Sequence, residues 1–250
     1  MNNPKEAYRI FAGYYDLYVH NFAEDLEFYT SVCTKSDEII EVGCGTGRVL
    51  NHFLQNNFNI TGVDISSEML EIAKNKLVPY INDKKLTLIN HDFSENTLQK
   101  RFNKALVTFY TFNYIIDRPV VFLQNIRKCM RKSGKIYLDM FYPFSFIDPS
   151  IENKWTEKEF KIKGRTIILK DKRYVKDNLE YRKQVYLEKG KEITIETLRK
   201  YYSPLDIGII LKNAGFSDIN YSYTYNRSLF TGEITEKKLN HNFVVSAVNQ

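Results

Sequence analysis

Short apolar runs alternate with amphipathic stretches over the first 140 residues of the chain. The apolar runs have the length of strands and cover residues 38–42, 60–64, 86–91, 105–109 and 135–140. The amphipathic stretches have the apolar spacing of helices and cover residues 48–56, 66–77 and 120–131. Ser66 or Ser67 can cap the second helix, and the Ser133–Gly134 turn should end the third. This alternation predicts right-handed βαβ units and a parallel sheet with helices on both faces.

Both ends of the chain extend this pattern. Residues 7–33 are expected to be helical, because five aromatic residues recur there at intervals of three or four. Ser203 followed by Pro204 suits the start of a helix, which should run to residues 213–214 and stop at Gly215. Two further strands, residues 219–225 and 243–248, close the chain.

Helical spacing disappears between Trp155 and Tyr202, where apolar and polar residues alternate one by one. One parity carries apolar residues, namely Leu179, Tyr181, Val185 and Leu187. The other parity carries polar residues, namely Glu180, Arg182, Gln184 and Glu188. With turns at residues 177–178 and 189–190, these are amphipathic antiparallel strands. The sequence predicts an inserted antiparallel β-subdomain over residues 146–202, and a surrounding α/β domain made of residues 1–145 and 203–250.

The net charge of the chain is +6, and the whole excess falls in residues 151–200, which hold 15 basic and 9 acidic residues. A basic segment of this kind can attract a phosphate-bearing substrate or nucleic acid. The alternative interpretation is a solvated strand face. Charge alone does not decide between the two.

Composition excludes several classes of protein. With 43% hydrophobic and 14% aromatic residues, the chain is globular rather than disordered. No apolar run approaches the roughly 20 residues of a membrane span, and residues 1–10 do not resemble a secretory signal, so no membrane contact is expected. The three cysteines are odd in number and widely spaced, which favours free thiols and a cytoplasmic location. The four histidines have no metal-type spacing with them, so we expect no metal site.

A glycine-rich turn carries the candidate chemistry. Residues 41–47 read Glu-Val-Gly-Cys-Gly-Thr-Gly and lie between the first predicted strand and the first predicted helix after it. Ligands bind at this edge of an open α/β sheet, where glycines allow close approach to the backbone. A dinucleotide site would have its third glycine at position 48, which is Arg48, so an NAD-dependent oxidoreductase is the weaker alternative. The spacing suits S-adenosylmethionine (SAM), which has an amino-acid tail and an adenosine but no pyrophosphate.

Two further carboxylates follow at the expected places. Asp64 ends the second strand, 21 residues after Gly43, and could accept both hydroxyls of a ribose. Asp92 follows the third strand and could accept from an adenine amino group, while Phe93 or Met69 packs on the ring. Taken singly, an acid at a strand end can be a helix cap, and Met69 can be part of the core. Together these residues favour a SAM site.

Residues 41–47, 62–70 and 91–93 resemble the first three motifs of class I SAM-dependent methyltransferases, and the similarity extends over nearly the whole chain. The resemblance implies a Rossmann-like seven-stranded sheet whose last strand is antiparallel. It implies SAM as cofactor, with S-adenosylhomocysteine as product. The glycines would lie along the methionine portion of SAM, with Asp64 at its ribose and Asp92 at its adenine. The candidate cofactor-binding residues are Glu41, Gly43, Cys44, Gly45, Gly47, Asp64, Ile65, Met69, Asp92, Phe93, Thr108 and Tyr14.

A narrower resemblance concerns the acceptor. Residues 8–16 are similar to the lid helix of small-molecule N-methyltransferases such as glycine N-methyltransferase-like enzymes, which would place Tyr8 near the transferred methyl group. Residues 227–232 resemble a stretch of sugar-amine N,N-dimethyltransferases. Where some of those enzymes have a histidine after the fourth strand, this chain has Tyr114, and Asn103 replaces an aspartate common in the fourth strand. Tyr8 and Tyr114 are therefore the candidate catalytic residues.

These observations predict an enzyme that transfers the methyl group of SAM to a small-molecule acceptor, by in-line displacement at an amine nitrogen. The alternatives are an O-methyltransferase, an RNA-modifying methyltransferase and an NAD-dependent oxidoreductase. Nucleic acid is not an expected partner, because no RNA-recognition motif or long basic tail occurs. An anionic acceptor, such as a nucleotide sugar, would suit the basic insertion if that insertion covers the site. The sequence is compatible with a homodimer.

Overall fold

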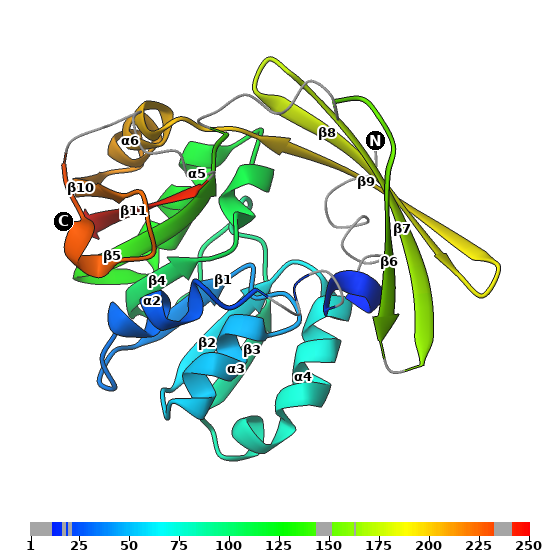
Figure 1. The fold of residues 1–250 in the computed structure, drawn as a ribbon. Helices are drawn as coiled ribbons and strands as arrows, with labels where there is room; N and C mark the ends of the chain where they lie inside the picture. Colours follow the sequence, from blue (N-terminus) through cyan, green and yellow to red (C-terminus); the bar gives the residue numbers. More distant parts are fainter. Residues whose placement is uncertain (1–11, 17–18, 20–21, 144–151, 163, 233–241) are drawn as a thin grey trace.

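The computed structural model describes residues 12–16, 19, 22–143, 152–162, 164–232 and 242–250. Its main element is a seven-stranded sheet with the order β10-β11-β5-β4-β1-β2-β3 (Figure 1). The strands are β1 (Ile39–Val42), β2 (Ile60–Asp64), β3 (Leu86–Asn90), β4 (Phe102–Val107), β5 (Met130–Phe141), β10 (Phe216–Ser222) and β11 (Asn242–Asn249). β1 pairs in parallel with both β2 and β4, whereas β11 is antiparallel to β5 and β10. The predicted sheet with an antiparallel last strand is confirmed.

Helices cover both faces of this sheet, as predicted. Consecutive residues of β1 point to opposite sides, so Ile39 joins one hydrophobic cluster and Ile40 joins the other. The first cluster contains residues of α2 (Leu26–Ser31), α3 (Arg48–Gln55) and α4 (Ser67–Asn82). The second contains residues of α5 (Pro119–Lys128) and α6 (Pro204–Asn213). No helix within the described ranges is long and apolar enough to cross a membrane.

The order of winding places a crevice at the carboxyl end of β1. From β1 the chain passes to β2 and β3 on one side of the sheet, and then to β4 and β5 on the other. In an open parallel sheet, such a reversal leaves a crevice between the two crossover connections, and ligands bind there. The glycine turn at residues 43–47 lies at this point, because it joins β1 to α3.

A second, separate sheet is formed by β6 (Thr156–Ile162), β7 (Arg165–Lys176), β8 (Leu179–Glu188) and β9 (Lys191–Lys200), all antiparallel. Its hairpin turns fall at residues 177–178 and 189–190, as predicted. Both residues of each turn have positive φ, which matches the right-handed twist of the adjoining strands. Figure 1 shows this sheet as a long twisted ribbon beside the carboxyl end of the seven-stranded sheet. The predicted antiparallel insertion is therefore present as a second sheet.

The prediction of one continuous helix over residues 7–33 is wrong. Within the described residues, helical turns at 12–16 and α2 are separated by residues 22–25, which are not helical. The cause is a contact distant in sequence. Arg48 donates to the carbonyl of Phe22 and to both carboxylate oxygens of Asp25, at 2.7 and 2.6 Å, so the chain turns at Asp25, which precedes α2.

Several other boundaries differ from prediction. β4 and β5 begin earlier, at Phe102 and Met130, and β10 covers Phe216–Ser222 rather than residues 219–225. α5 ends at Lys128, because the backbone at Cys129 and Met130 already pairs with Phe102 of β4. The turn predicted at Ser133–Gly134 is wrong as the end of this helix, since both residues lie within β5. α4 continues past residue 77 to Asn82, with a kink at Leu77 ahead of Pro79. β4 ends at Val107, because residues 109 and 110 adopt positive φ.

The ion pair between Arg48 and Asp25 yields a stability prediction. Asp25 is completely buried, so replacing Arg48 with Met leaves an unpaired charge inside the protein. We expect Arg48→Met to lower the free energy of unfolding by about 3–5 kcal/mol, measured by urea denaturation. Arg131→Met, at an exposed position, is the control and should unfold like the wild type. Equal stability of both variants would show that the pair does not hold the N-terminal segment.

Candidate active site

The turn between β1 and α3 is shaped by its glycines. Gly43, Gly45 and Gly47 all have positive φ, at 76°, 54° and 86°, which favours glycine. A Cβ atom on Gly43 would lie 2.4 Å from Cγ2 of Thr111, so a larger residue there would collide with the segment after β4. The spacing of the glycines is thus a requirement of this backbone.

Asp64 ties the turn to the neighbouring strand. Its Oδ2 accepts the backbone N–H of Gly45 at 2.8 Å, and its Oδ1 accepts that of Ser66 at 2.9 Å. Burial raises the pKa of Asp64, and these backbone donors oppose the shift. Ser66 also caps α4 by accepting the N–H of Met69, which settles the alternative caps in its favour. One carboxylate therefore positions both the turn and the start of α4.

A cavity of about 460 Å³ lies at this edge, within the usual range of roughly 300–1,000 Å³ for small-molecule sites. The glycine turn and the ends of β2 and β3 form one wall, and the four-stranded sheet forms another. Most of the candidate residues line it, namely Gly43, Gly45, Asp64, Ile65, Met69, Asp92, Phe93 and Tyr114. The structure therefore brings together the two carboxylates, the apolar residues beside them and one candidate catalytic tyrosine.

The other candidates that the structure describes do not line the cavity. Cys44 packs in the core, and Gly47 is the residue immediately before α3. Tyr14 packs on Tyr186 of β8, with ring centroids 4.7 Å apart. Glu41 and Thr108 are buried under the turn. Tyr8 lies outside the described residues. Their assigned roles stay predictions.

Glu41 and Thr108 form a buried pair. The hydroxyl of Thr108 donates to Oε1 of Glu41 at 2.7 Å, whereas Oε2 has no hydrogen-bond partner among the described residues. Burial raises the pKa of Glu41 to about 8, although the Thr108 hydroxyl and Arg48 oppose this rise. The folded protein thus favours the neutral carboxylic acid at this position.

The aromatic wall of the cavity is held by a second buried acid. Asp139 of β5 accepts the backbone N–H of Phe109 at 3.1 Å and hydroxyl hydrogen bonds from Tyr29 and Tyr225. Burial raises the pKa of Asp139 to about 7, with these donors opposing. Phe109 and the stacked Tyr110 beside it, both with positive φ, line the cavity.

The sequence analysis raised the basic insertion as a possible cover of the site but named none of the residues that it contributes. Arg173, Arg182, Gln184, Thr197 and Arg199 line the cavity. The polar parity of β8 was the available signal, but it was equally consistent with a solvated strand face. Glu180 and Gln184 are in fact buried, so the solvated interpretation is wrong for this part of the strand. Among the residues that the structure describes, no cluster of three or more His, Cys, Asp or Glu could hold a metal ion.

The raised pKa of Glu41 predicts a pH dependence of stability. A carboxyl whose pKa is higher in the folded than in the unfolded chain stabilises the fold fully below its unfolded pKa, and this stabilisation is lost as pH rises through the folded value. The free energy of unfolding should therefore fall between pH 5 and pH 8, and Glu41→Gln should remove part of that slope. Urea denaturation across this range measures it, with the exposed Glu95→Gln as control. An unchanged slope in Glu41→Gln would contradict the assignment.

Comparison with known proteins agrees with this geometry. A family model described as a methyltransferase domain matches residues 15–221. The chain is 27% identical over 145 residues to a malonyl-[acyl-carrier protein] O-methyltransferase of Priestia megaterium, covering 56% of this chain and about half, 49%, of that relative.

Two solved structures share the fold over nearly their whole length. A SAM-dependent methyltransferase from Clostridium acetobutylicum has a TM-score of 0.75 and 18% identity, covering 96% of this chain and 98% of that one. CalS10, an amino pentose methyltransferase from Micromonospora echinaspora, has a TM-score of 0.70 and 15% identity, with coverages of 95% and 97%. The chain therefore belongs to the methyltransferase domain family, with the fold of the class I SAM-dependent enzymes.

Proposed function

We propose that the protein transfers the methyl group of SAM to a small-molecule acceptor, and that the attacking atom is an amine nitrogen. The observation that carries this proposal is the meeting, in one cavity, of the glycine turn, Asp64 and Asp92 with an aromatic wall. The glycine turn, Asp64 and Asp92 fit the chemical groups of the cofactor. The aromatic wall provides an apolar surface for the methyl transfer.

The residues at the cofactor end fit the chemistry of SAM. Each oxygen of Asp64 accepts one backbone N–H, and a carboxylate oxygen has a further lone pair that can accept a ribose hydroxyl. Asp92 accepts the N–H of Ser94 through Oδ1, and its second oxygen can accept from the adenine amino group. Ile65, Met69 and Phe93 supply apolar surface beside these acids, against which an adenine ring can pack.

The acceptor end of the cavity is aromatic. Tyr15, Phe109, Tyr110, Tyr114 and Phe141 all line it. When bound, SAM supplies a methyl group already activated by its sulfonium, so the protein has mainly to orient the acceptor and exclude water. Orientation of this kind can contribute about 7–11 kcal/mol to the rate. Ring faces also interact favourably with a positively charged reacting centre.

The buried tyrosines favour an amine as acceptor. Burial raises the pKa of Tyr15 and of Tyr110, so both remain neutral phenols near pH 7. Neutral phenols can hold an amine by hydrogen bonds but are poor bases for removing a proton from an alcohol. An unprotonated amine already carries the lone pair that attacks. Tyr114 lines the same wall and is our candidate for orienting the acceptor amine through a hydrogen bond.

Calorimetric titration with SAM tests the cofactor site. The wild type should release heat on binding. Asp92→Asn keeps an oxygen for Ser94 but turns the other acceptor into a donor, so its affinity for SAM should fall about tenfold or more. Asp83→Asn, at an exposed carboxylate after α4, is the control and should bind like the wild type. A wild type that binds no SAM would end the proposal.

A screen for S-adenosylhomocysteine release over amines, phenols and carboxylates tests the acceptor. Amines should be turned over, and Tyr114→Phe should lower kcat about tenfold or more while SAM affinity stays unchanged. Tyr174→Phe, on the exposed part of β7, should behave like the wild type. Turnover confined to phenols or carboxylates would show that the acceptor atom is oxygen and not nitrogen.

A further inference from the structure

Strand register gathers the polar side chains of the four-stranded sheet on one face. Arg173 of β7 pairs with Arg182 of β8, which pairs with Thr197 of β9. Residues two positions along a strand lie on the same face, so Gln184 and Arg199 join them. All five line the cavity described above. We call this set, Arg173, Arg182, Gln184, Thr197 and Arg199, the arginine face.

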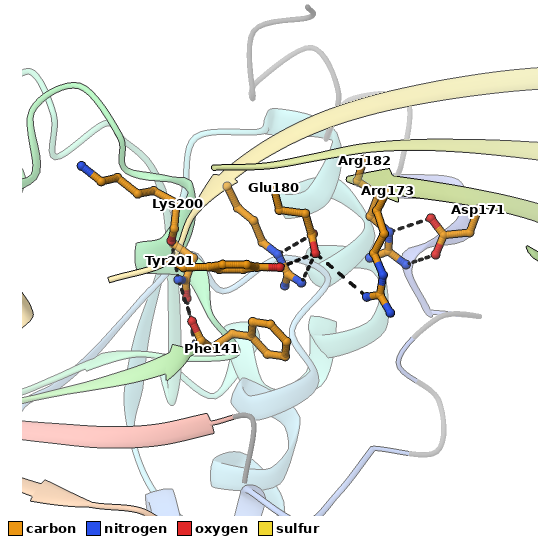
Figure 2. Close-up of polar contacts among 9 residues, drawn as sticks. Phe141, Asp171, Arg173, Glu180, Arg182, Lys200 and Tyr201 are labelled. Carbon is orange, nitrogen blue, oxygen red and sulfur yellow. Dashed lines mark hydrogen bonds and ion pairs between the residues drawn. The ribbon is translucent and has the colours of Figure 1, made fainter. Parts of the chain in front are cut away.

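Two of its three guanidinium groups are held by carboxylates. Arg182 donates from Nε and Nη2 to the two oxygens of Asp171, at 2.9 and 2.6 Å (Figure 2). Nε of Arg199 lies 2.6 Å from Oε1 of Glu180, and its Nη2 donates to Oε2 at 2.9 Å. Burial alone would raise the pKa of Glu180, but Arg199 and its other neighbours outweigh burial and lower it. Glu180 is therefore an anion that forms an ion pair with Arg199.

Arg173 has no comparable partner among the residues that the structure describes. Its ion pair with Glu180 joins Nη1 and Oε2 at 4.0 Å, beyond hydrogen-bond distance, and that oxygen already accepts from Arg199 and Tyr201 (Figure 2). Its side chain is 33% exposed. Three arginines against two carboxylates leave one positive charge in excess at this wall of the cavity.

Gln184 gives an independent sign that a ligand atom belongs here. It is only 4% exposed, yet its Nε2 has no hydrogen-bond partner among the described residues. An unpaired amide donor at a buried position is costly. Because Gln184 lines the cavity, an acceptor atom of a bound molecule can satisfy it.

We infer that the arginine face binds an anionic group of the methyl acceptor, a carboxylate or a phosphate, through Arg173 and the amide of Gln184. This inference rests on the proposed function, because it names the class of acceptor. The guanidinium fork matches the oxygens of either anion, and the amide adds a neutral donor. Arg182 and Arg199, neutralised by Asp171 and Glu180, hold the wall in place, and Arg173 supplies its net positive charge.

Three probes of similar size test it by calorimetry on the full chain saturated with S-adenosylhomocysteine. They are phenyl phosphate, benzoate and uncharged benzamide. One of the acidic probes, or both, should bind at least about tenfold more tightly than benzamide, and the stronger one identifies the anion. Arg173→Met should weaken acidic probes about tenfold and leave benzamide unchanged. Lys183→Met, which removes a positive charge from the opposite, exposed side of β8, should bind all three like the wild type.

Equal affinity of the wild type for all three probes overturns the inference, as does unchanged affinity of Arg173→Met for the acidic ones. Gln184→Leu provides a second variant, in which the acidic probes should also weaken, so a folding defect in one variant leaves the other to decide. Circular dichroism checks the fold of each. A wild type that fails to bind S-adenosylhomocysteine overturns the proposed function itself, an outcome distinct from loss of selectivity for anions.

Discussion

The attachment of the β1–α3 turn to its neighbouring strand is the constraint on which the site depends. The N–H groups of Gly43 and Cys44 donate to the carbonyl of Val63, at 2.8 and 3.0 Å, and that of Gly45 donates to Asp64. These bonds require positive φ at the glycines and fix the Asp64 carboxylate without any ligand. The cofactor end of the cavity is thus preorganised. Ligand binding therefore loses little free energy to the ordering of this wall.

The two sheets make one cavity because a buried side chain joins them. Asn113 is completely buried in the short helical turn after β4. Its Nδ2 donates to the carbonyls of Phe141 at the end of β5 and Lys200 at the end of β9, at 3.0 and 2.6 Å, and its Oδ1 accepts the N–H of Phe141. The hydroxyl of Tyr202 adds a bond to the carbonyl of Ile115. These contacts fix the position of the arginine face relative to the glycine turn. Selectivity between acceptors requires such a fixed position.

Local pattern was enough to predict the strands, the glycine turn and the carboxylates after β2 and β3, because periodicity and spacing within a few residues determine them. It was not enough where distant residues decide. The break before α2 depends on Arg48, which is 23 residues beyond Asp25 and captures its carboxylate. The basic charge of the insertion was noted, but the residues of the arginine face were not identified, for a similar reason. The alternation of apolar and polar residues shows that β8 has a polar side. Only the position of the second sheet beside the cavity shows that Gln184 on this side is buried.

A crystal structure of the protein with S-adenosylhomocysteine would test this arrangement most directly. The ribose hydroxyls should lie on the Asp64 carboxylate and the adenine between Asp92 and the side chains of Met69 and Phe93, with the sulfur directed toward the aromatic wall. A nucleoside bound in the opposite direction, or bound elsewhere with the crevice at the glycine turn left empty, would contradict it.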